Sequence, residues 1–127
     1  MSARVKRVIP ILRIFSVEKA REFYVDYLGF HVDWEHRFEP NLPLYMQVSR
    51  DGLVLHLTEH YGDSTPGSKI HIDYEGVCEL HAEITAKNYN YLRPGLCDDP
   101  NWGTVQLNLI DPFGNRLQFG EPKADSK

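Results

Sequence analysis

The sequence has 127 residues, of which 42% are hydrophobic and 25% charged, as is typical of one globular domain. The formal net charge of −4 argues against a nucleic-acid-binding protein, because such proteins usually carry a basic surface. No apolar run approaches the roughly 20 residues that a membrane helix needs, and Pro10 and Arg13 interrupt the segment that a signal peptide would keep apolar. The two cysteines, Cys78 and Cys97, are expected to remain thiols in a reducing cytoplasm.

The N-terminal segment predicts a strand followed by a helix. Alternating apolar residues indicate a strand over 5–15, with an edge or a kink at Pro10. Ser16 occupies the position of a helix N-cap, and apolar residues at helical spacing predict a helix over 17–28. Gly29 is expected to end that helix in the left-handed conformation.

Three further strands are expected in the first half, over 30–38, 44–49 and 53–59. Asp51-Gly52 lies between the last two and is a strong hairpin signal. In the last strand the leucines at 53, 55 and 57 share one face, which should bury against the helix. His56 lies on the opposite face, together with Val54 and Thr58.

After a turn-rich linker at 61–68, the order of elements repeats. A strand over 69–75, a helix marked by Val77, Leu80 and Ile84, and a strand over 90–96 are followed by a hairpin, 104–110 and 115–119, around Asp111-Pro112-Phe113-Gly114. Val17 and Val77 are 60 residues apart, and Gly52 and Gly114 are 62 apart. The sequence therefore predicts one α+β domain over 1–127, built from two βαβββ modules at about 5–60 and 69–121.

Each predicted sheet has one apolar face and one polar face. The polar faces would carry Arg13, Tyr45, Gln47, His56, Lys69, His71, Asp73, Gln106, Asn108, Arg116 and Gln118. These side chains are too polar to form a second core. We therefore expect curved mixed sheets around a wet cleft, with the helices on the outer faces.

Local motifs in this order resemble a known superfamily. They are Phe23-Tyr24 with Leu28-Gly29-Phe30, then Asp51-Gly52-Leu53-Val54-Leu55-His56-Leu57, then Trp102-Gly103 with Asp111-Pro112-Phe113-Gly114-Asn115. Over about 5–121 the chain is similar to the vicinal-oxygen-chelate superfamily of glyoxalase I, extradiol dioxygenases and bleomycin-resistance proteins. The resemblance implies the duplicated βαβββ fold.

The resemblance also implies where a metal would bind. The metal enzymes of the superfamily take ligands from four strand positions, which correspond here to Ile9, His56, Lys69 and Gln118. Ile9 has no donor atom, Lys69 is cationic and Gln118 is a weak neutral donor, whereas a divalent ion usually needs about three competent ligands. The chain therefore looks most like the bleomycin-resistance branch, whose members are homodimers that bind a bulky cationic glycopeptide between subunits without a cofactor or a catalytic residue.

The expected ligand-binding residues are Trp102, His56, Trp34, Phe38, Tyr45, Gln47, Lys69, His71 and Gln118. Trp102 would either stack on an aromatic ligand or pack in the dimer interface. Asp33, with Glu35 and Glu39, would complement a cationic ligand or form a solvated edge.

Two other functions stay open at this point. A register shift of two residues would assemble His56, His71 and Gln118 into the metal site of a glyoxalase-type lyase or a dioxygenase. A third possibility is a family member without activity that binds an unrelated small molecule. Arg13 and Asp73, which occupy equivalent positions in the repeat, would either pair with each other or hold a charged ligand.

Overall fold

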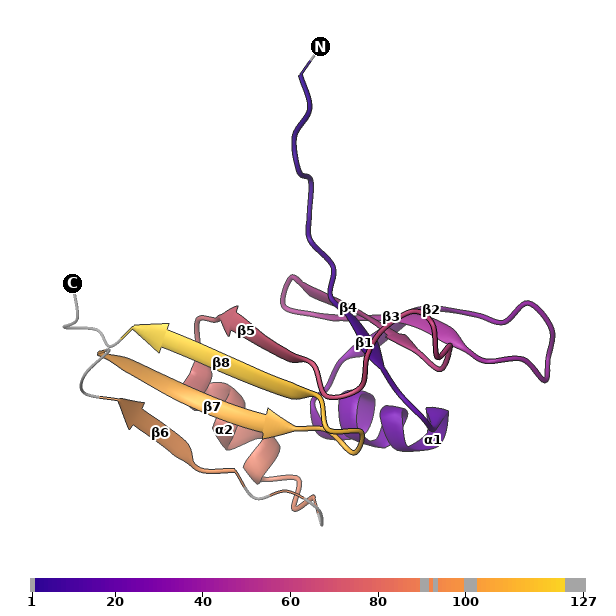
Figure 1. Ribbon diagram of the computed structural model, residues 1–127. Helices are drawn as coiled ribbons and strands as arrows, with labels where there is room; N and C mark the ends of the chain where they lie inside the picture. Colours follow the sequence, from indigo (N-terminus) through magenta and orange to yellow (C-terminus); the bar gives the residue numbers. More distant parts are fainter. Residues whose placement is uncertain (1, 90–91, 93, 100–102, 123–127) are drawn as a thin grey trace.

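The computed structural model describes residues 2–89, 92, 94–99 and 103–122, and it contains two four-stranded mixed sheets. Figure 1 shows a helix covering one face of each sheet, the first sheet nearly edge-on and the second nearly face-on. This arrangement confirms the predicted α+β fold class with its repeated order of elements. Within the described residues, none of the helices is long and apolar enough to cross a bilayer.

The first module contains four strands and one helix. Its strands lie in the order β1-β4-β3-β2, with β1 parallel to β4 and the other neighbours antiparallel. Its elements are β1 (Ile11–Arg13), α1 (Val17–Ala20), the π-helical segment η1 (Arg21–Tyr27), β2 (His31–His36), β3 (Tyr45–Arg50) and β4 (Leu53–Thr58).

The second module repeats this topology with the order β5-β8-β7-β6, in which β5 is parallel to β8. Its elements are β5 (Lys69–Asp73), α2 (Val77–Thr85), β6 (Leu96–Asp99), β7 (Thr104–Ile110) and β8 (Arg116–Pro122). The parallel edge pair in each module places the first strand of the module beside its last strand.

The first helix begins and ends where the sequence predicts. The side chain of Ser16 accepts a hydrogen bond from the Lys19 N–H, which caps α1. The helix then widens into η1, where the Leu28 N–H donates to the Phe23 carbonyl five residues earlier. Gly29 follows with a φ of 76°, a left-handed conformation that favours glycine.

The prediction for the first strand is wrong in length, because β1 covers only Ile11–Arg13 instead of 5–15. In the parallel register Ile11 lies opposite His56, so residues before position 8 would run past the start of β4. Pro10 also lacks the N–H that a ladder requires. Residues 2–8 are exposed and form an N-terminal arm that extends away from both sheets (Figure 1).

The prediction of a strand over 90–96 is wrong for residues 92, 94 and 95, which belong to no strand, and β6 covers Leu96–Asp99. Residues 90, 91 and 93 lie outside the described residues. Pro94 and Gly95 immediately precede the strand, and both residue types disfavour regular pairing. The register of β7 determines where β6 begins, since Leu96 pairs with Leu107 and Asp99 with Thr104.

Buried side chains from both modules form one continuous core. It includes Leu12, Phe23, Tyr24, Leu55, Leu57, Val77, Leu80, Ile84, Leu107, Leu117 and Phe119. The predicted apolar faces of β4, β7 and β8 are therefore confirmed as the core faces.

A buried hydrogen-bond network joins the two modules at the turn between β7 and β8. The carboxylate of Asp111 accepts four hydrogen bonds, from the N–H groups of Phe113 and Asn115 (both 2.8 Å), from Asn115 Nδ2 (2.9 Å) and from the Tyr24 hydroxyl (2.6 Å). Asn115 Nδ2 also donates to the carbonyl of Arg13 in β1 at 2.8 Å. These contacts explain why Asp and Asn stand at the two ends of the Asp-Pro-Phe-Gly-Asn motif.

A second contact between the modules is centred on Arg50, at the end of β3. Its guanidinium donates to both carboxylate oxygens of Glu83 in α2, at 2.6 and 2.7 Å, and to the carbonyl of Leu28 at 2.6 Å. Its Nε donates to Asp51 at 2.9 Å, and Asp51 also accepts from Tyr74 at 2.5 Å. Lys87, just after α2, also donates to the carbonyls of Asp26 and Tyr27 in η1, at 3.0 and 2.9 Å, so charged or buried hydrogen bonds join the modules at more than one place.

Candidate ligand-binding faces

The sheet face that points away from the first helix carries a set of aromatic and polar side chains, which we call the first face. Strand pairing places Trp34 of β2 opposite Gln47 of β3, and Gln47 opposite His56 of β4. Tyr45 lies two residues before Gln47 and therefore on the same face. Three strands thus bring these four side chains together, and alternation along β3 and β4 predicts the shared face of Tyr45, Gln47 and His56.

Hydrogen bonds fix the orientation of His56. Its Nδ1 is 2.7 Å from the Tyr45 hydroxyl, and its Nε2 is 3.0 Å from Gln47 Oε1. Because an amide oxygen can only accept, Nε2 carries the proton and Nδ1 accepts from Tyr45. Burial lowers the pKa of His56 below its usual value, and the nearby charge of Arg7 lowers it further, so the neutral ring is favoured.

A β-bulge adds a negative charge to the first face. The pairing of β2 with β3 shifts between Val32 and Trp34, so the extra residue, Asp33, reaches the same face as Trp34. Its carboxylate accepts from Gln47 Nε2 and from the Ser49 hydroxyl, both at 2.9 Å. Hydrogen bonds from Gln47, His31 and Ser49 lower the pKa of Asp33, which therefore stays ionised at neutral pH.

The indole of Trp34 contacts two neighbouring rings and remains partly exposed to solvent. Its ring is nearly parallel to that of Tyr45, with 6.0 Å between centroids, and meets His56 edge-on at 5.3 Å. Even so, Trp34 is 42% exposed. Its orientation is fixed by these neighbours, while enough surface remains for a flat ligand to stack on it.

The polar face of the second sheet, here the second face, carries a separate cluster. His71 and Gln118 are opposite each other in β5 and β8, with 2.9 Å between Nδ1 and Oε1. Gln118 Nε2 in turn donates to Asn108 at 3.0 Å. A hollow of about 460 Å³ next to this cluster is lined by Lys69, Asn108, Ile110, Arg116 and Gln118, among other residues of the second module.

One of the predicted site residues, Phe38, lies on neither face. Phe38 follows β2, is 74% exposed and contacts the rings of His36 and His60 instead of the Trp34 cluster. Trp102 lies outside the described residues. The remaining predicted residues divide between the faces, with Trp34, Tyr45, Gln47 and His56 on the first and Lys69, His71 and Gln118 on the second.

The three residues of the alternative metal site are divided in the same way. His71 and Gln118 are in contact, whereas His56 belongs to the other sheet and uses both ring nitrogens within the first face. Within the described part of the chain, no three His, Cys, Asp or Glu side chains gather to form a metal site. Arg13 does not pair with Asp73 but donates to the carbonyl of Glu59 and lies 4.5 Å from the ring centre of Phe15.

Strict alternation along β2 does not predict that Asp33 and Trp34 share a face. A signal was nevertheless available, because two polar partners, Gln47 and Ser49, alternate along the neighbouring strand. Only the bulge makes Asp33 their common acceptor.

Several solved structures share this fold at low sequence identity. The bleomycin resistance determinant encoded on the transposon Tn5 is 18% identical, with a TM-score of 0.71 over 93% of this chain and 98% of that one. TnmS3, an antibiotic binding protein from Streptomyces sp. CB03234, is 20% identical, with a TM-score of 0.69 over 96% and 100%. A bleomycin-binding protein complexed with bleomycin is 19% identical, with a TM-score of 0.66 over 94% and 100%.

A comparison with family models, in contrast, identifies the family. No curated protein matched the sequence. A family model described as glyoxalase superfamily protein matches residues 2–126, almost the whole chain. The chain therefore belongs to the glyoxalase superfamily.

Proposed function

We propose that this protein binds and sequesters a small aromatic ligand that carries positive charge, with a bleomycin-like glycopeptide as the first candidate. The observation that carries the proposal is the first face, where an exposed indole of fixed orientation lies beside the ionised carboxylate of Asp33. A flat ring would stack on Trp34 and a cationic group would pair with Asp33. The bleomycin-binding and antibiotic-binding proteins of the same fold support this choice.

We propose further that a homodimer forms the complete cleft. The hollow beside the second face is lined by second-module residues, so a ligand held there would be covered from one side. A second copy would supply the opposite wall. It would also cover Val5 and Val8 of the N-terminal arm, which are 76% and 80% exposed. The free, exposed thiol of Cys78 agrees with a cytoplasmic location.

The main test is calorimetric titration with metal-free bleomycin in the presence of EDTA. Trp34→Ala should weaken binding by about 1–3 kcal/mol, the size of an aromatic stacking contact. Tyr61→Ala is the matched control, because Tyr61 is 88% exposed in the linker and belongs to neither face. Trp102→Ala tests the remaining predicted aromatic residue. A wild-type protein that does not bind bleomycin would reject the glycopeptide.

Charge provides a second test. Asp33→Asn should weaken binding and should reduce its dependence on salt, since one ion pair is lost. Asp26→Asn is the control, because Asp26 is exposed on η1, on the opposite side of the first sheet. Equal effects of the two substitutions would show that net charge, and not the first face, attracts the ligand.

One observation favours a second candidate, a metal-dependent lyase or dioxygenase. His71 and Gln118 are in contact on the second face, and in a dimer the first face of the other copy could supply His56. Elemental analysis of protein purified without a chelator decides between the two functions. One metal ion per subunit that is lost in His56→Ala would support the enzyme and reject metal-independent binding.

Sedimentation equilibrium tests the dimer. We expect a dimer at micromolar concentration, and Val5→Ser with Val8→Ser should weaken it if the arm contributes to the interface. A strict monomer would mean that each face binds its ligand without help from a second copy.

A further inference from the structure

The hollow of about 460 Å³ beside the second face differs from the first face in its charge. Lys69 of β5 and Arg116 of β8 both line it, and none of its described lining residues is Asp or Glu. These strands lie side by side (Figure 1), and their parallel register places the two cations directly opposite each other. Like charges opposite each other on one face of a sheet repel, so the pair costs stability until an anion compensates it.

Neither cation has a partner within the described part of the chain. No ion pair or side-chain hydrogen bond among those residues involves Lys69 or Arg116, and both residues are exposed. Asp73 lies on the same face, but it is four residues further along β5, which corresponds to about 13 Å, and its carboxylate is 3.1 Å from Nε2 of His71. At that distance, salt in solution screens most of its attraction for Lys69.

The amides beside the two cations offer donors to a ligand. The Oε1 atom of Gln118 is 2.9 Å from Nδ1 of His71, and Asn108 Oδ1 accepts from Gln118 Nε2 at 3.0 Å, so both amide oxygens are engaged. Within the described residues, the Nδ2 group of Asn108 donates to no other group. Ammonium and guanidinium groups also donate and cannot accept. An anion in the hollow would therefore find N–H donors on several sides.

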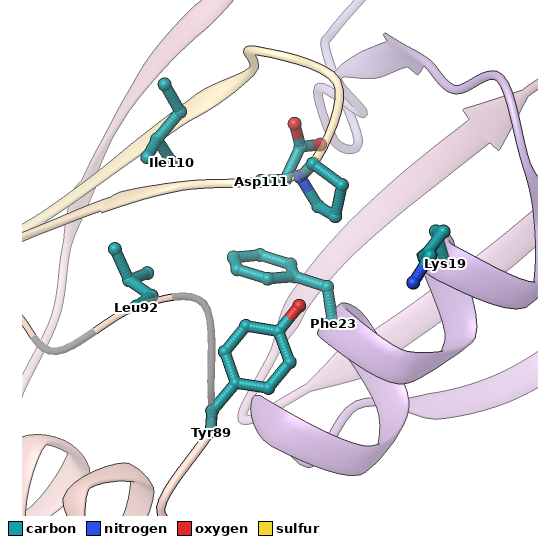
Figure 2. A pocket seen from close by; sticks show the side chains of 7 residues that line it. Lys19, Phe23, Tyr89, Leu92, Ile110 and Asp111 are labelled. Atoms are coloured by element: carbon teal, nitrogen blue, oxygen red, sulfur yellow. The ribbon is translucent and has the colours of Figure 1, made fainter.

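This arrangement favours an oxyanion with two negative charges. The planar guanidinium of Arg116 can bind two oxygens of one phosphate group, and the ammonium of Lys69 adds a compact positive charge. A dianion compensates both cations, whereas a monoanion leaves one charge uncompensated. Ile110, which ends β7 next to the Asp111 turn (Figure 2), lies opposite Arg116 and is 45% exposed. It offers an apolar surface beside the charged pair.

From these contacts we infer that the second face is a binding site for a phosphate monoester. The phosphoryl group lies between Lys69 and Arg116 and accepts from Asn108, while the organic group covers Ile110. The inference goes beyond the proposed function, because this site lies on the other sheet, takes the opposite charge and needs neither Trp34 nor Asp33.

A titration followed by ¹H–¹⁵N NMR tests this site, in low-salt buffer at pH 8, where phosphate monoesters are dianions. Phenyl phosphate is the probe, benzoate has the same ring with one charge, and inorganic phosphate has no ring. We expect phenyl phosphate to shift backbone amide signals of β5, β7 and β8, and to bind several-fold tighter than the other two. Equal binding of benzoate would refute the preference for a dianion, and equal binding of inorganic phosphate would refute the contact with the organic group.

Substitutions locate the charge that matters. Lys69→Gln and Arg116→Gln should each weaken phenyl phosphate by about three- to five-fold, the upper range for an exposed ion pair, and the double variant should lose the shifts in β5 and β8. Arg116→Lys should recover part of the loss, because it restores the charge without the planar fork. Lys6→Gln is the matched control, since it removes one positive charge from the N-terminal arm. An equal loss in Lys6→Gln would mean that net charge attracts the anion to no particular site.

Thermal melts provide an independent measurement and verify that every variant is folded. Because the two cations repel each other, Lys69→Gln should not lower the Tm in phosphate-free buffer of low salt. Phenyl phosphate should raise the Tm of the wild type but not that of the Lys69→Gln, Arg116→Gln double variant. A lower Tm in Lys69→Gln would show that Lys69 has a stabilising partner within the protein, and would overturn the inference.

The first face provides the last control. Trp34→Ala and Asp33→Asn should retain phenyl phosphate, and its loss in either variant would place the anion on the first face instead. A protein that binds phenyl phosphate but not bleomycin would support this site and reject the glycopeptide. A protein that binds bleomycin but shows no shift with phenyl phosphate would overturn this inference alone.

Discussion

The buried hydrogen bond between Tyr24 and Asp111 should contribute measurably to stability. Tyr24 is fully buried and Asp111 is only 4% exposed, and the hydroxyl lies 2.6 Å from Oδ2. Tyr24→Phe removes one oxygen atom and leaves the ring packing in place. A net hydrogen bond to a charged group is worth roughly 1.5–3 kcal/mol, so we expect a loss of about 2 kcal/mol in the free energy of unfolding.

Tyr74→Phe is the matched control, because the Tyr74 hydroxyl also donates to a carboxylate, that of Asp51, at 2.5 Å. The side chain of Asp51 is 51% exposed, so water can replace the lost donor and the cost should be about 0.5 kcal/mol or less. Urea unfolding at pH 7 measures both values, with unchanged m values as the condition for comparison. Equal losses in the two variants would refute the argument that burial determines the cost.

The pH dependence of the Tyr24→Phe effect has a defined sign. Burial raises the pKa of Asp111, and the Tyr24 hydroxyl opposes that rise. A carboxyl whose folded pKa is raised destabilises the fold as the pH rises through that pKa. Without Tyr24's donor the rise is larger, so the variant should lose more stability at pH 7 than at pH 4. Equal losses at the two pH values would contradict this argument, because the ionisation of Asp111 would then not contribute to the difference.

Three further outcomes are expected. Gly29→Ala should lower the free energy of unfolding in urea by about 1 kcal/mol more than Gly52→Ala. Both glycines have positive φ, but only at Gly29 would the new Cβ lie 2.8 Å from Arg50 Nη1, which is hydrogen-bonded to the Leu28 carbonyl. Equal losses would show that the Arg50 side chain moves aside freely. Burial lowers the pKa of His56, so the contribution of its neutral ring to stability is complete above the unfolded pKa of about 6.5 and is lost as the pH falls. His56→Gln should therefore reduce the fall in the free energy of unfolding between pH 7 and 5, by less than about 1 kcal/mol, and an unchanged fall would contradict this. Thr58→Val should cost about 1–2 kcal/mol, because the buried hydroxyl donates to Asp63 and accepts from the His60 N–H, and Thr58→Ser should restore most of the loss if hydrogen bonding is the cause.

Features of the fold that depend only on residues close together in the sequence could be predicted. Ser16 and Gly29 mark the ends of the first helix because capping and left-handed backbone need only local chemistry. Asp51-Gly52 forms a hairpin turn, with positive φ at both residues, for the same reason. The length of β1 could not be predicted, because it depends on where β4 begins, more than 40 residues later.

The sequence could predict which residues lie on the polar faces, but not which of them lie in contact with one another. Alternation along β3 and β4 correctly places Tyr45, Gln47 and His56 on one face. The contact of His71 with Gln118 depends on the parallel register of β5 and β8, which no local motif specifies. A cavity of about 340 Å³ lined by Phe23 of the first module and Ile110 of the second (Figure 2) could not be predicted either, because it forms only when the two modules pack together.

The side chain of Asn115 has a consequence for how the domain unfolds. It links the turn of the second module to the Arg13 carbonyl, and its Oδ1 accepts from the Ser68 N–H in the linker. Arg50 with Glu83, and Lys87 with the carbonyls of η1, make further contacts between the modules, so each module leaves polar groups unpaired when it is alone. Fragments produced by cutting the chain at 61–67 should therefore not fold separately, but should regain structure when mixed. Although the two halves repeat each other, the domain should unfold as a single cooperative unit.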